Sequence, residues 1–213
     1  MIIHQLHFNK ESRANCFREQ LVKKIKVGET VYFENKEIVK GCPYSPEEIN
    51  FFGVWSHKAQ TKIRAAGNRN FSLTTLYKKV CNDYPTDVIG FHHSIKNMLI
   101  FTGERREILD RCFSHICREL KLKVAPRGAI RFAVMQNHFL ARPHVFNRYV
   151  EEALRPAMDL IESNAIPEIW QGCEYTQAAP GVKYTFIPFV LEKLFSAWLQ
   201  NNPAIKCTYF KDL

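Results

Sequence analysis

The chain has 213 residues, of which 46% are apolar and 24% are charged, a composition that excludes a disordered or collagen-like protein and suits one domain with a buried core. Its formal net charge of +9 predicts an anionic partner, such as nucleic acid, anionic lipid or a phosphorylated small molecule. The lysines and arginines are scattered rather than clustered, so solvated helix faces explain them as well as a binding patch does.

Apolar periodicity along the chain predicts strands that alternate with helices. Strands are predicted over residues 2–8, 30–33, 87–91, 98–101, 129–135 and 205–210. Helices are predicted over residues 12–26, 72–81, 104–120, 143–162 and 188–198, with another opened by Ser45 and Glu48. Pro156 is expected to kink the helix over 143–162, and residues 164–184 to form a loop over a site. This order predicts an α/β fold: a single domain over residues 1–213 with a mostly parallel central sheet flanked by helices.

Membrane and redox signals are weak in this sequence. No apolar run approaches the roughly 20 residues of a membrane span, and the start of the chain lacks the pattern of a signal peptide. The seven cysteines include no C-x-x-C pair, which predicts reduced thiols. We therefore expect a cytoplasmic protein with no membrane span.

The common phosphate-binding and catalytic motifs are missing. The sequence contains no P-loop, no dinucleotide-binding glycine fingerprint, no G-x-S-x-G elbow and no H-E-x-x-H. These absences argue against a P-loop kinase, a hydrolase with a serine triad and a zinc protease. The chemistry must therefore rest on side chains.

The sharpest cluster follows the predicted strand over 87–91, which ends in His92, His93 and Ser94, with Lys96 soon after. Ligands of open α/β sheets bind beyond the carboxyl ends of strands. Imidazole can ligate a divalent metal, donate to a phosphate or act as a general base. The other interpretation is one core histidine and one surface histidine.

A second cluster comprises Gln136, Asn137 and His138, followed by Arg142 and a helix that starts at Pro143. Arg142 and the helix N-terminus would make a corner that attracts anions. An ordinary strand–helix connection capped by asparagine would give the same pattern.

Two further features have two interpretations each. Trp55, followed by Ser56, His57 and Lys58 and later by Arg64 and Arg69, could stack on a base while the cations meet phosphate; it also fits a plain core position in FFGVW. Glu192 lies in the apolar stretch PFVLEKLFSAW, where a carboxylate either faces solvent or is held inside for a purpose.

Three blocks of the sequence, taken in order, resemble a family of bacterial capsular and cell-surface polysaccharide glycosyltransferases. Residues 72–77 (SLTTLY) and 87–93 (DVIGFHH) are similar to the family's E-L-T-A-L-Y and D-Y-V-G-L-C-H-Y-R-R. Residues 133–149 are similar to its N-M-F-I-M … F-D-E-Y block, and residues 189–199 (FVLEKLFSAWL) to its G-F-L-A-E-R-L-L … W-L helix. Together the blocks span residues 72–199.

The resemblance implies a GT-A-like (Rossmann-like) fold and a hexosyltransferase that uses a nucleotide sugar. In such enzymes the first strand and the following loop usually hold the nucleotide, which makes His7 a candidate for donor binding. An Asp-x-Asp motif at the end of a central strand usually holds Mn²⁺, and this chain contains no Asp-x-Asp. His92 and His93 stand at about that strand end. Either a histidine helps bind a divalent metal (Mn²⁺ or Mg²⁺), or cations neutralise the donor diphosphate without one.

We therefore predict that the protein moves a sugar from a UDP-linked donor to a hydroxyl of a glycan or glycoprotein acceptor, in surface polysaccharide or glycoprotein glycan synthesis. Residues 1–100 are expected to bind the nucleotide sugar, and residues 101–213 to form the acceptor side. Glu192 and His138 are the candidate catalytic bases, and His92 and His93 the candidate metal ligands.

The candidate donor-binding residues are His7, Trp55, Arg64, Arg69, Thr74, Tyr77, His92, His93, Lys96 and Arg142. Thr74, Tyr77, His93 and Glu192 match positions of the family's motifs, whereas Arg142 does not and rests on the residues alone.

Two other classes stay open. The missing Asp-x-Asp leaves room for a glycosyltransferase-like domain that has lost catalysis and serves as a binding partner. The positive charge and the 13% aromatic residues suit a nucleic-acid-binding protein, which would show cations on one face and affinity that falls with salt. We rank the active transferase first, the inactive relative second and the nucleic-acid binder third.

Overall fold

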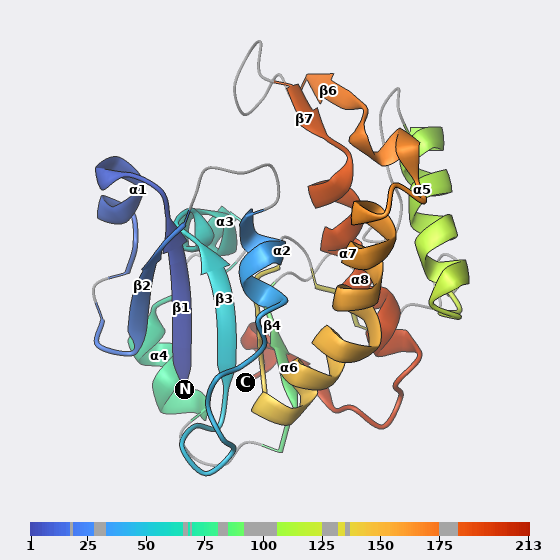
Figure 1. Ribbon diagram of the computed structural model, residues 1–213. Helices are drawn as coiled ribbons and strands as arrows, with labels where there is room; N and C mark the ends of the chain where they lie inside the picture. Colours follow the sequence, from blue (N-terminus) through green and yellow to red (C-terminus); the bar gives the residue numbers. More distant parts are fainter. Residues whose placement is uncertain are drawn as a thin grey trace.

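One mixed sheet forms the centre of the protein. The computed structural model describes residues 1–17, 19–27, 33–65, 68, 70–80, 85–91, 106–124, 132–134, 137–174 and 183–213. Within them, six strands lie in the order β2-β1-β3-β5-β4-β8 (Figure 1). They are β1 (Ile2–His7), β2 (Val22–Lys26), β3 (Phe52–Ser56), β4 (Val88–Gly90), β5 (Phe139–Ala141) and β8 (Cys207–Tyr209). β5 runs antiparallel to both its neighbours, and the other five strands share one direction. The predicted α/β class with a mostly parallel sheet is confirmed.

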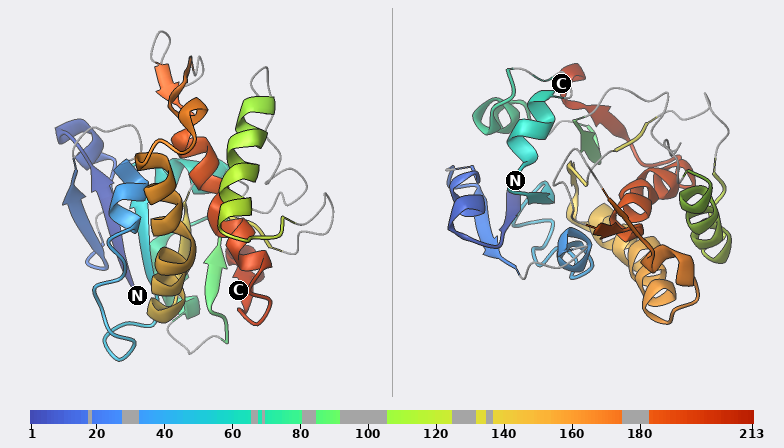
Figure 2. Two further views of the ribbon diagram at one scale, coloured as in Figure 1. Left: turned by 45° about the vertical axis from the view of Figure 1, so that its right-hand side comes forward. Right: turned by 90° about the horizontal axis from the view of Figure 1, so that it is seen from above.

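Helices cover both faces of the sheet (Figure 2). One face carries α3 (Ala59–Ala65) and α4 (Leu73–Val80). The other carries α2 (Phe33–Ile38), α6 (Pro143–Tyr149), α7 (Arg155–Glu162) and α8 (Ile187–Gln200), with α5 (Arg106–Glu119) packed against α8. Side chains alternate across a strand, so Val54 packs in the core under α8 whereas Trp55 packs in the core under α3 and α4. The sheet is therefore buried on both sides.

Several predicted elements are confirmed. The strands predicted over 2–8, 87–91 and 205–210 contain β1, β4 and β8, and the helices predicted over 72–81, 104–120 and 188–198 contain α4, α5 and most of α8. Ser72 Oγ accepts a hydrogen bond from the backbone N–H of Thr75, which caps the start of α4. In these segments the apolar period and the tertiary structure agree.

The predicted helix over 12–26 is wrong. This segment contains the end of α1 (Lys10–Ala14), which opens with a capping box between Asn9 and Ser12, and all of β2. β2 is the edge strand of the sheet, and its lysines are exposed, as suits an edge that must not pair with other chains. The apolar spacing of Val22 and Ile25 fits a helix, but pairing with β1 decides for a strand.

Other expectations differ from the structure around β5. The described part of the strand predicted over 129–135 is not a strand, because side chains satisfy its backbone: Ser196 Oγ accepts from the N–H of Val134 at 2.8 Å, and Tyr209 Oη accepts from the N–H of Ala133 at 3.0 Å. The strand lies a few residues later, at β5. Residues 98–101 and most of the strand predicted over 30–33 lie outside the described part of the chain, and Phe33 begins α2.

The helix predicted over 143–162 is helical throughout but is not one regular α-helix. α6 and α7 are joined by a π-helical turn, η2 (Val150–Leu154), where the N–H of Arg155 donates to the carbonyl of Val150. Pro156 follows directly and has no N–H to donate, so the wider turn takes the place of the expected kink. Ser45 and Glu48 form only a turn, in which the N–H of Ser45 donates to the Glu48 carboxylate.

The segment expected to be a loop over 164–184 has some regular structure. It contains a 3₁₀ turn, η3 (Pro167–Trp170), and β6 (Gly172–Glu174), which pairs antiparallel with β7 (Lys183–Thr185) apart from the main sheet. A last 3₁₀ turn, η4 (Phe210–Asp212), follows β8.

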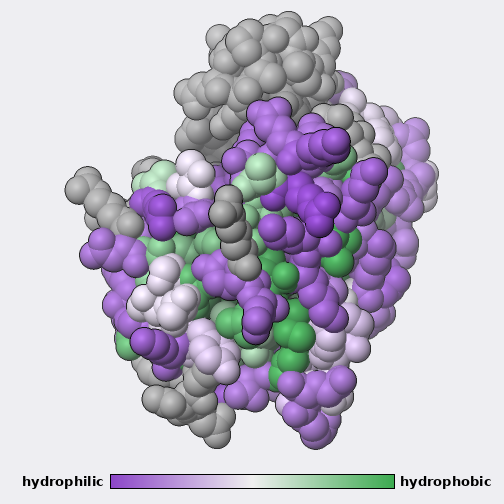
Figure 3. Space-filling view, turned by 90° about the vertical axis from the view of Figure 1, so that its left-hand side faces the viewer, coloured by the Kyte–Doolittle hydropathy of each residue, from purple (hydrophilic) through white to green (hydrophobic). Residues whose placement is uncertain are grey.

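The surface is mixed in polarity. Seen from the side of β2, polar side chains surround smaller apolar areas (Figure 3).

Among the described helices, none has both the length and the apolar character that crossing a bilayer requires. Cys16, Cys42, Cys112, Cys117 and Cys207 are free thiols.

Candidate functional site

The order of the strands marks one edge of the sheet. From β1 the chain passes to β2 on one side and then to β3 on the other, so the carboxyl ends of β1 and β3, at the top of Figure 1, lie where the winding reverses. Ligands of open α/β sheets bind in the crevice at such a point. Because β5 is antiparallel, its amino end lies at this same edge.

Titratable and polar side chains gather at this edge, which we call the carboxyl-edge site. They come from β1, α2, the end of β3, α3, the turn before β5, and α8. Its residues are His7, Glu34, Ser56, His57, Lys58, Lys62, Asn137, His138 and Glu192.

Glu34 on α2 organises one half of the site. Its carboxylate accepts hydrogen bonds from the side chains of Asn137 and Ser56. Asn137 adopts a left-handed backbone with φ of 54°, a conformation that asparagine tolerates better than most residues. Burial raises the pKa of Glu34, while the charges of Lys62 and Lys58 and the two hydrogen bonds lower it.

Glu192 on α8 is the second carboxylate of this half. The side chain is partly exposed, although α8 is mostly buried around it. Burial of the carboxyl raises the pKa of Glu192 to about 7; the charge of Lys62 opposes this shift and that of Glu34 adds to it. A carboxyl group of this kind is half ionised near neutral pH and can accept a proton there. Glu34 and Glu192 form the carboxylate half of the site.

His138 contacts the carboxylate half of the site through Ser56. Its ring has no exposed surface, packs edge-on against Trp55, and places Nε2 3.4 Å from Ser56 Oγ. The Ser56 hydroxyl also bonds the Glu34 carboxyl group, so Ser56 links His138 to Glu34, and the tautomer of the His138 ring sets which atom donates between Nε2 and Oγ.

His7 and His57 form the other half of the site, the imidazole half. In the register of β1 and β3, Leu6 lies beside Ser56, so the next residues, His7 and His57, are neighbours on the same face. Their side chains are only 7% and 8% exposed, and the buried Nδ1 atom of each has no hydrogen-bond partner. Burial is the main cause that lowers the pKa of both imidazoles, and nearby cations lower it further.

Two lysines of the α3 region act on both halves. Lys58 precedes α3 and Lys62 lies one turn later. Their charges lower the pKa of His57 and also that of Glu34, and Lys62 acts on Glu192 as well. The two halves are therefore parts of one electrostatic site.

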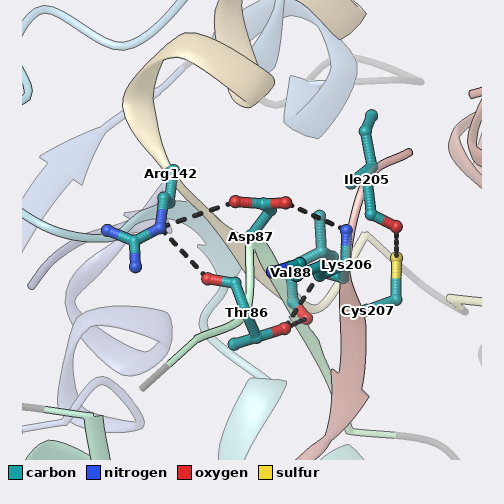
Figure 4. A network of polar contacts seen from close by, with 7 residues as sticks. All are labelled: Thr86, Asp87, Val88, Arg142, Ile205, Lys206 and Cys207. Carbon is teal, nitrogen blue, oxygen red and sulfur yellow. Dashed lines mark hydrogen bonds and ion pairs between the residues drawn. The ribbon is translucent and has the colours of Figure 1, made fainter. Parts of the chain in front are cut away.

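Arg142 is not part of this site. β5 separates Asn137 and His138 at its amino end from Arg142 at its carboxyl end, so the residues of this sequence cluster lie at opposite edges of the sheet. Instead, Arg142 Nε donates to the carbonyl of Thr86 at 3.1 Å and lies 3.6 Å from Asp87 Oδ1 (Figure 4). Asp87 Oδ2 accepts from the N–H of Lys206 at 2.9 Å. This network joins β5, β4 and the start of β8 at the opposite edge of the sheet.

Trp55 is also placed differently from the binding role predicted for it. The ring is fully buried, Nε1 donates to the carbonyl of Phe139 at 2.9 Å, and Phe91 packs edge-on against it. No face of the indole is open for a base to stack on, so the core interpretation of Trp55 is the right one.

The remaining described candidates lie on or beside α3 and α4. Arg64 donates to the carbonyl of Phe71, and Thr74 is exposed on α4. Tyr77 is 41% exposed and opens onto a small pocket beside Met1 and Asn50, which lie at the start of β1 and before β3. Tyr77 is therefore at the edge of the sheet opposite to the carboxyl-edge site.

Arg69, His92, His93 and Lys96 lie outside the described residues, so their predicted roles stay predictions. Among the residues that the structure does describe, no three His, Cys, Asp or Glu side chains converge in a way that could hold a metal ion. The metal ligands that the sequence predicts are the undescribed His92 and His93.

The sequence predicts binding or catalytic roles for His7, His138 and Glu192 of the carboxyl-edge site. It places Ser56, His57, Lys58 and Asn137 in candidate clusters without a separate role for each, and it gives no role to Glu34 or Lys62. Ser56 and His57 carry the same signal as His92 and His93, namely polar residues directly after a buried strand. Glu34 gives no such signal, because the segment just before it suggests a strand and only the folded chain brings α2 over the end of β3.

No family model, curated protein or solved structure matches the chain. Function is therefore inferred from the geometry of the site and from the three sequence blocks described above.

Proposed function

We propose that the protein is a glycosyltransferase that moves a sugar from a nucleoside diphosphate donor, UDP-linked, to a hydroxyl group of a glycan acceptor. The observation that carries the proposal is Glu192, a carboxylate held beside a second carboxylate at the edge of the sheet where α/β proteins bind ligands. The three sequence blocks give the reaction class, and Glu192 lies in the third of them.

The reaction makes two demands on the protein. The acceptor oxygen forms a bond to the anomeric carbon as the bond from that carbon to the diphosphate oxygen breaks. The hydroxyl proton must pass to a base, and the electron pair that leaves with the diphosphate must be stabilised by positive charge or hydrogen-bond donors.

Glu192 suits the role of the base better than His138. Its side chain reaches solvent, and its pKa of about 7 balances the ionised fraction against basicity at neutral pH. The ring of His138 has no exposed surface and is engaged with Ser56. In this mechanism His138 positions Ser56, and through it Glu34, while Glu192 takes the proton.

The diphosphate demand falls on the imidazole half of the site and on Lys58 and Lys62. His7 ends β1, and the resemblance implies that the nucleotide is held by the first strand and the loop after it. The resemblance also implies a divalent metal ion, which would supply positive charge to the diphosphate. The ligands predicted for it, His92 and His93, are outside the described residues.

A nucleotide panel tests the proposal. The purified chain is melted with UDP, GDP, CMP and dTDP, each with and without Mn²⁺. A ligand at 100 times its dissociation constant stabilises the folded state by about 2.7 kcal/mol, which for a chain of this size raises the melting temperature by roughly 5–10 °C. We expect UDP to give the largest shift, and the UDP sugar then to be hydrolysed slowly or transferred to a glycan.

Absence of a shift with any nucleotide would contradict the proposal. A shift without any hydrolysis or transfer would instead indicate a glycosyltransferase-like domain that has lost catalysis, an alternative that the missing Asp-x-Asp favours.

A further inference from the structure

His7 and His57 each bury a polar ring nitrogen that has no hydrogen-bond partner. Each imidazole is more than nine-tenths buried. The ring of His7 bonds the backbone of Asn9, but a buried nitrogen left without a partner loses its hydrogen bond to water, which destabilises the folded state. Buried polar groups are nearly always paired in native proteins, and the exceptions call for an explanation such as a missing ligand.

The surroundings of the two rings specify the charge of that ligand. The charged side chains that act on His7 and His57 come from α1, β2 and the α3 region. They are Glu11, Arg13, Lys24, Lys26, Lys58 and Lys62. Five of these six are cations, so the field at the two imidazoles favours a polyanion and repels a free divalent cation.

The geometry adds direction to this field. His7 ends β1 and His57 directly follows β3, on parallel strands that lie about 5 Å apart in a sheet. The Gln5 side chain of β1 donates to the carbonyl of Ser56 at 3.0 Å and accepts from the N–H of Phe17 at 2.8 Å, and Phe8 packs edge-on against the His57 ring at 5.1 Å. Two imidazoles carried by neighbouring parallel strands suit a ligand with two linked anionic groups.

From these observations we infer that His7 and His57, together with Lys58 and Lys62, bind the diphosphate of the sugar donor directly, without a bridging metal ion. His57 donates an N–H to a phosphate oxygen, and His7, whose ring already bonds the backbone of Asn9, does so with a proton that it takes up when the anion binds. The lysines neutralise the charge that grows on the diphosphate as the glycosyl bond breaks. The inference rests on the proposed function for the identity of the donor, but the site can be tested with pyrophosphate alone.

The test is calorimetric titration of the full chain with inorganic pyrophosphate at pH 7, once with EDTA and once with Mn²⁺. We expect binding in EDTA that Mn²⁺ changes little. Binding only in the presence of Mn²⁺, or no binding in either buffer, would overturn the inference.

Variants separate a ligand role from a structural one. His57→Leu should weaken pyrophosphate at least about tenfold, as the loss of a hydrogen bond to a charged group does, while the melting temperature stays equal or rises, because an unpaired buried polar group is removed. A purely structural histidine would show the reverse. His144→Gln, on the exposed N-terminal turn of α6, is the matched control and should leave the affinity unchanged.

A lysine variant covers the case in which the histidine variant does not fold. Lys62→Met changes a partly exposed helix position and should also weaken pyrophosphate at least about tenfold, whereas Lys78→Met on the exposed face of α4 should not. If Lys62→Met binds as the original chain does, the inference is wrong.

The outcome is independent of the proposed function. If pyrophosphate binding depends on His57 and Lys62 but no nucleotide sugar is turned over, the proposed transferase function is wrong and the inferred diphosphate site is supported. If the chain transfers sugar but these variants bind pyrophosphate normally, the inferred site is wrong and the proposed function is supported.

Discussion

Glu34 on α2 adds to the rise that burial causes in the pKa of Glu192 on α8, so two carboxylates from opposite ends of the chain act on one another at the carboxyl edge of the sheet. Both residues are partly exposed, and the Glu34 carboxylate is also held by hydrogen bonds from Ser56 and Asn137. We therefore expect Glu34 to be fixed by the protein and Glu192 to be the carboxylate that a substrate meets.

Replacing Glu192 by Gln should remove the base and keep the fold. We expect the rate of glycosyl transfer to fall by about 10²–10⁴-fold, the usual contribution of a general base, with the nucleotide-induced shift in melting temperature retained. Assays of transfer and of nucleotide binding on the same preparation check this. Glu151→Gln, at an exposed position, is the matched control and should leave the transfer rate unchanged.

The same residue should make stability depend on pH. The pKa of Glu192 is raised from 4.5 to about 7 in the folded state, so between these values the folded state binds more protons than the unfolded state. Stability must then fall as the pH rises through this window. At 1.36 kcal/mol per unit of pKa, the loss is about 3 kcal/mol at most.

Urea unfolding of the original chain and of Glu192→Gln at pH 4.5 and pH 8 measures this contribution. We expect the variant to be the more stable protein at pH 8 and the difference to shrink at pH 4.5. Equal differences at both pH values would mean that Glu192 ionises normally.

Asn137 should matter through both its backbone and its side chain. Asn137→Ala removes a donor to the Glu34 carboxylate, which costs about 1.5–3 kcal/mol, and leaves alanine in the left-handed region, which asparagine tolerates better than alanine does. Asn137→Gly loses the same hydrogen bond without the backbone penalty of roughly 1–2 kcal/mol. Chemical denaturation should therefore rank the native chain above the Gly variant and the Gly variant above the Ala variant. If the Ala and Gly variants have equal free energies of unfolding, the left-handed backbone at position 137 places no demand on the residue type.

Arg142 should be a structural residue. Arg142→Ala breaks the contacts with Thr86 and Asp87 and is expected to lower stability by about 1 kcal/mol, because the pair is partly exposed, or roughly 2–4 °C in melting temperature. Nucleotide affinity should not change. A fall in affinity at unchanged stability would restore the binding role that the sequence suggested for this arginine.

The sequence by itself determined the elements whose periodicity and packing agree, such as β1, α4, α5 and α8, and with them the α/β class. It also singled out His138 and Glu192, because each is a titratable residue beside a predicted strand or inside an apolar stretch, whereas His7 became a candidate through the resemblance to the glycosyltransferase family. These are local signals, and local pattern is all that a single sequence displays.

Only the tertiary structure decided which of these residues meet. β5 is three residues long and antiparallel, and its direction places His138 at the carboxyl-edge site and Arg142 at the opposite edge. β2 is a strand because it pairs with β1, although its spacing also fits a helix. Glu34 becomes half of a carboxylate pair because α2 packs over the end of β3 while α8 brings Glu192 to the same place. Pairing between strands and packing between distant helices are long-range interactions, so the residues that make the site are joined by contacts that no local pattern records.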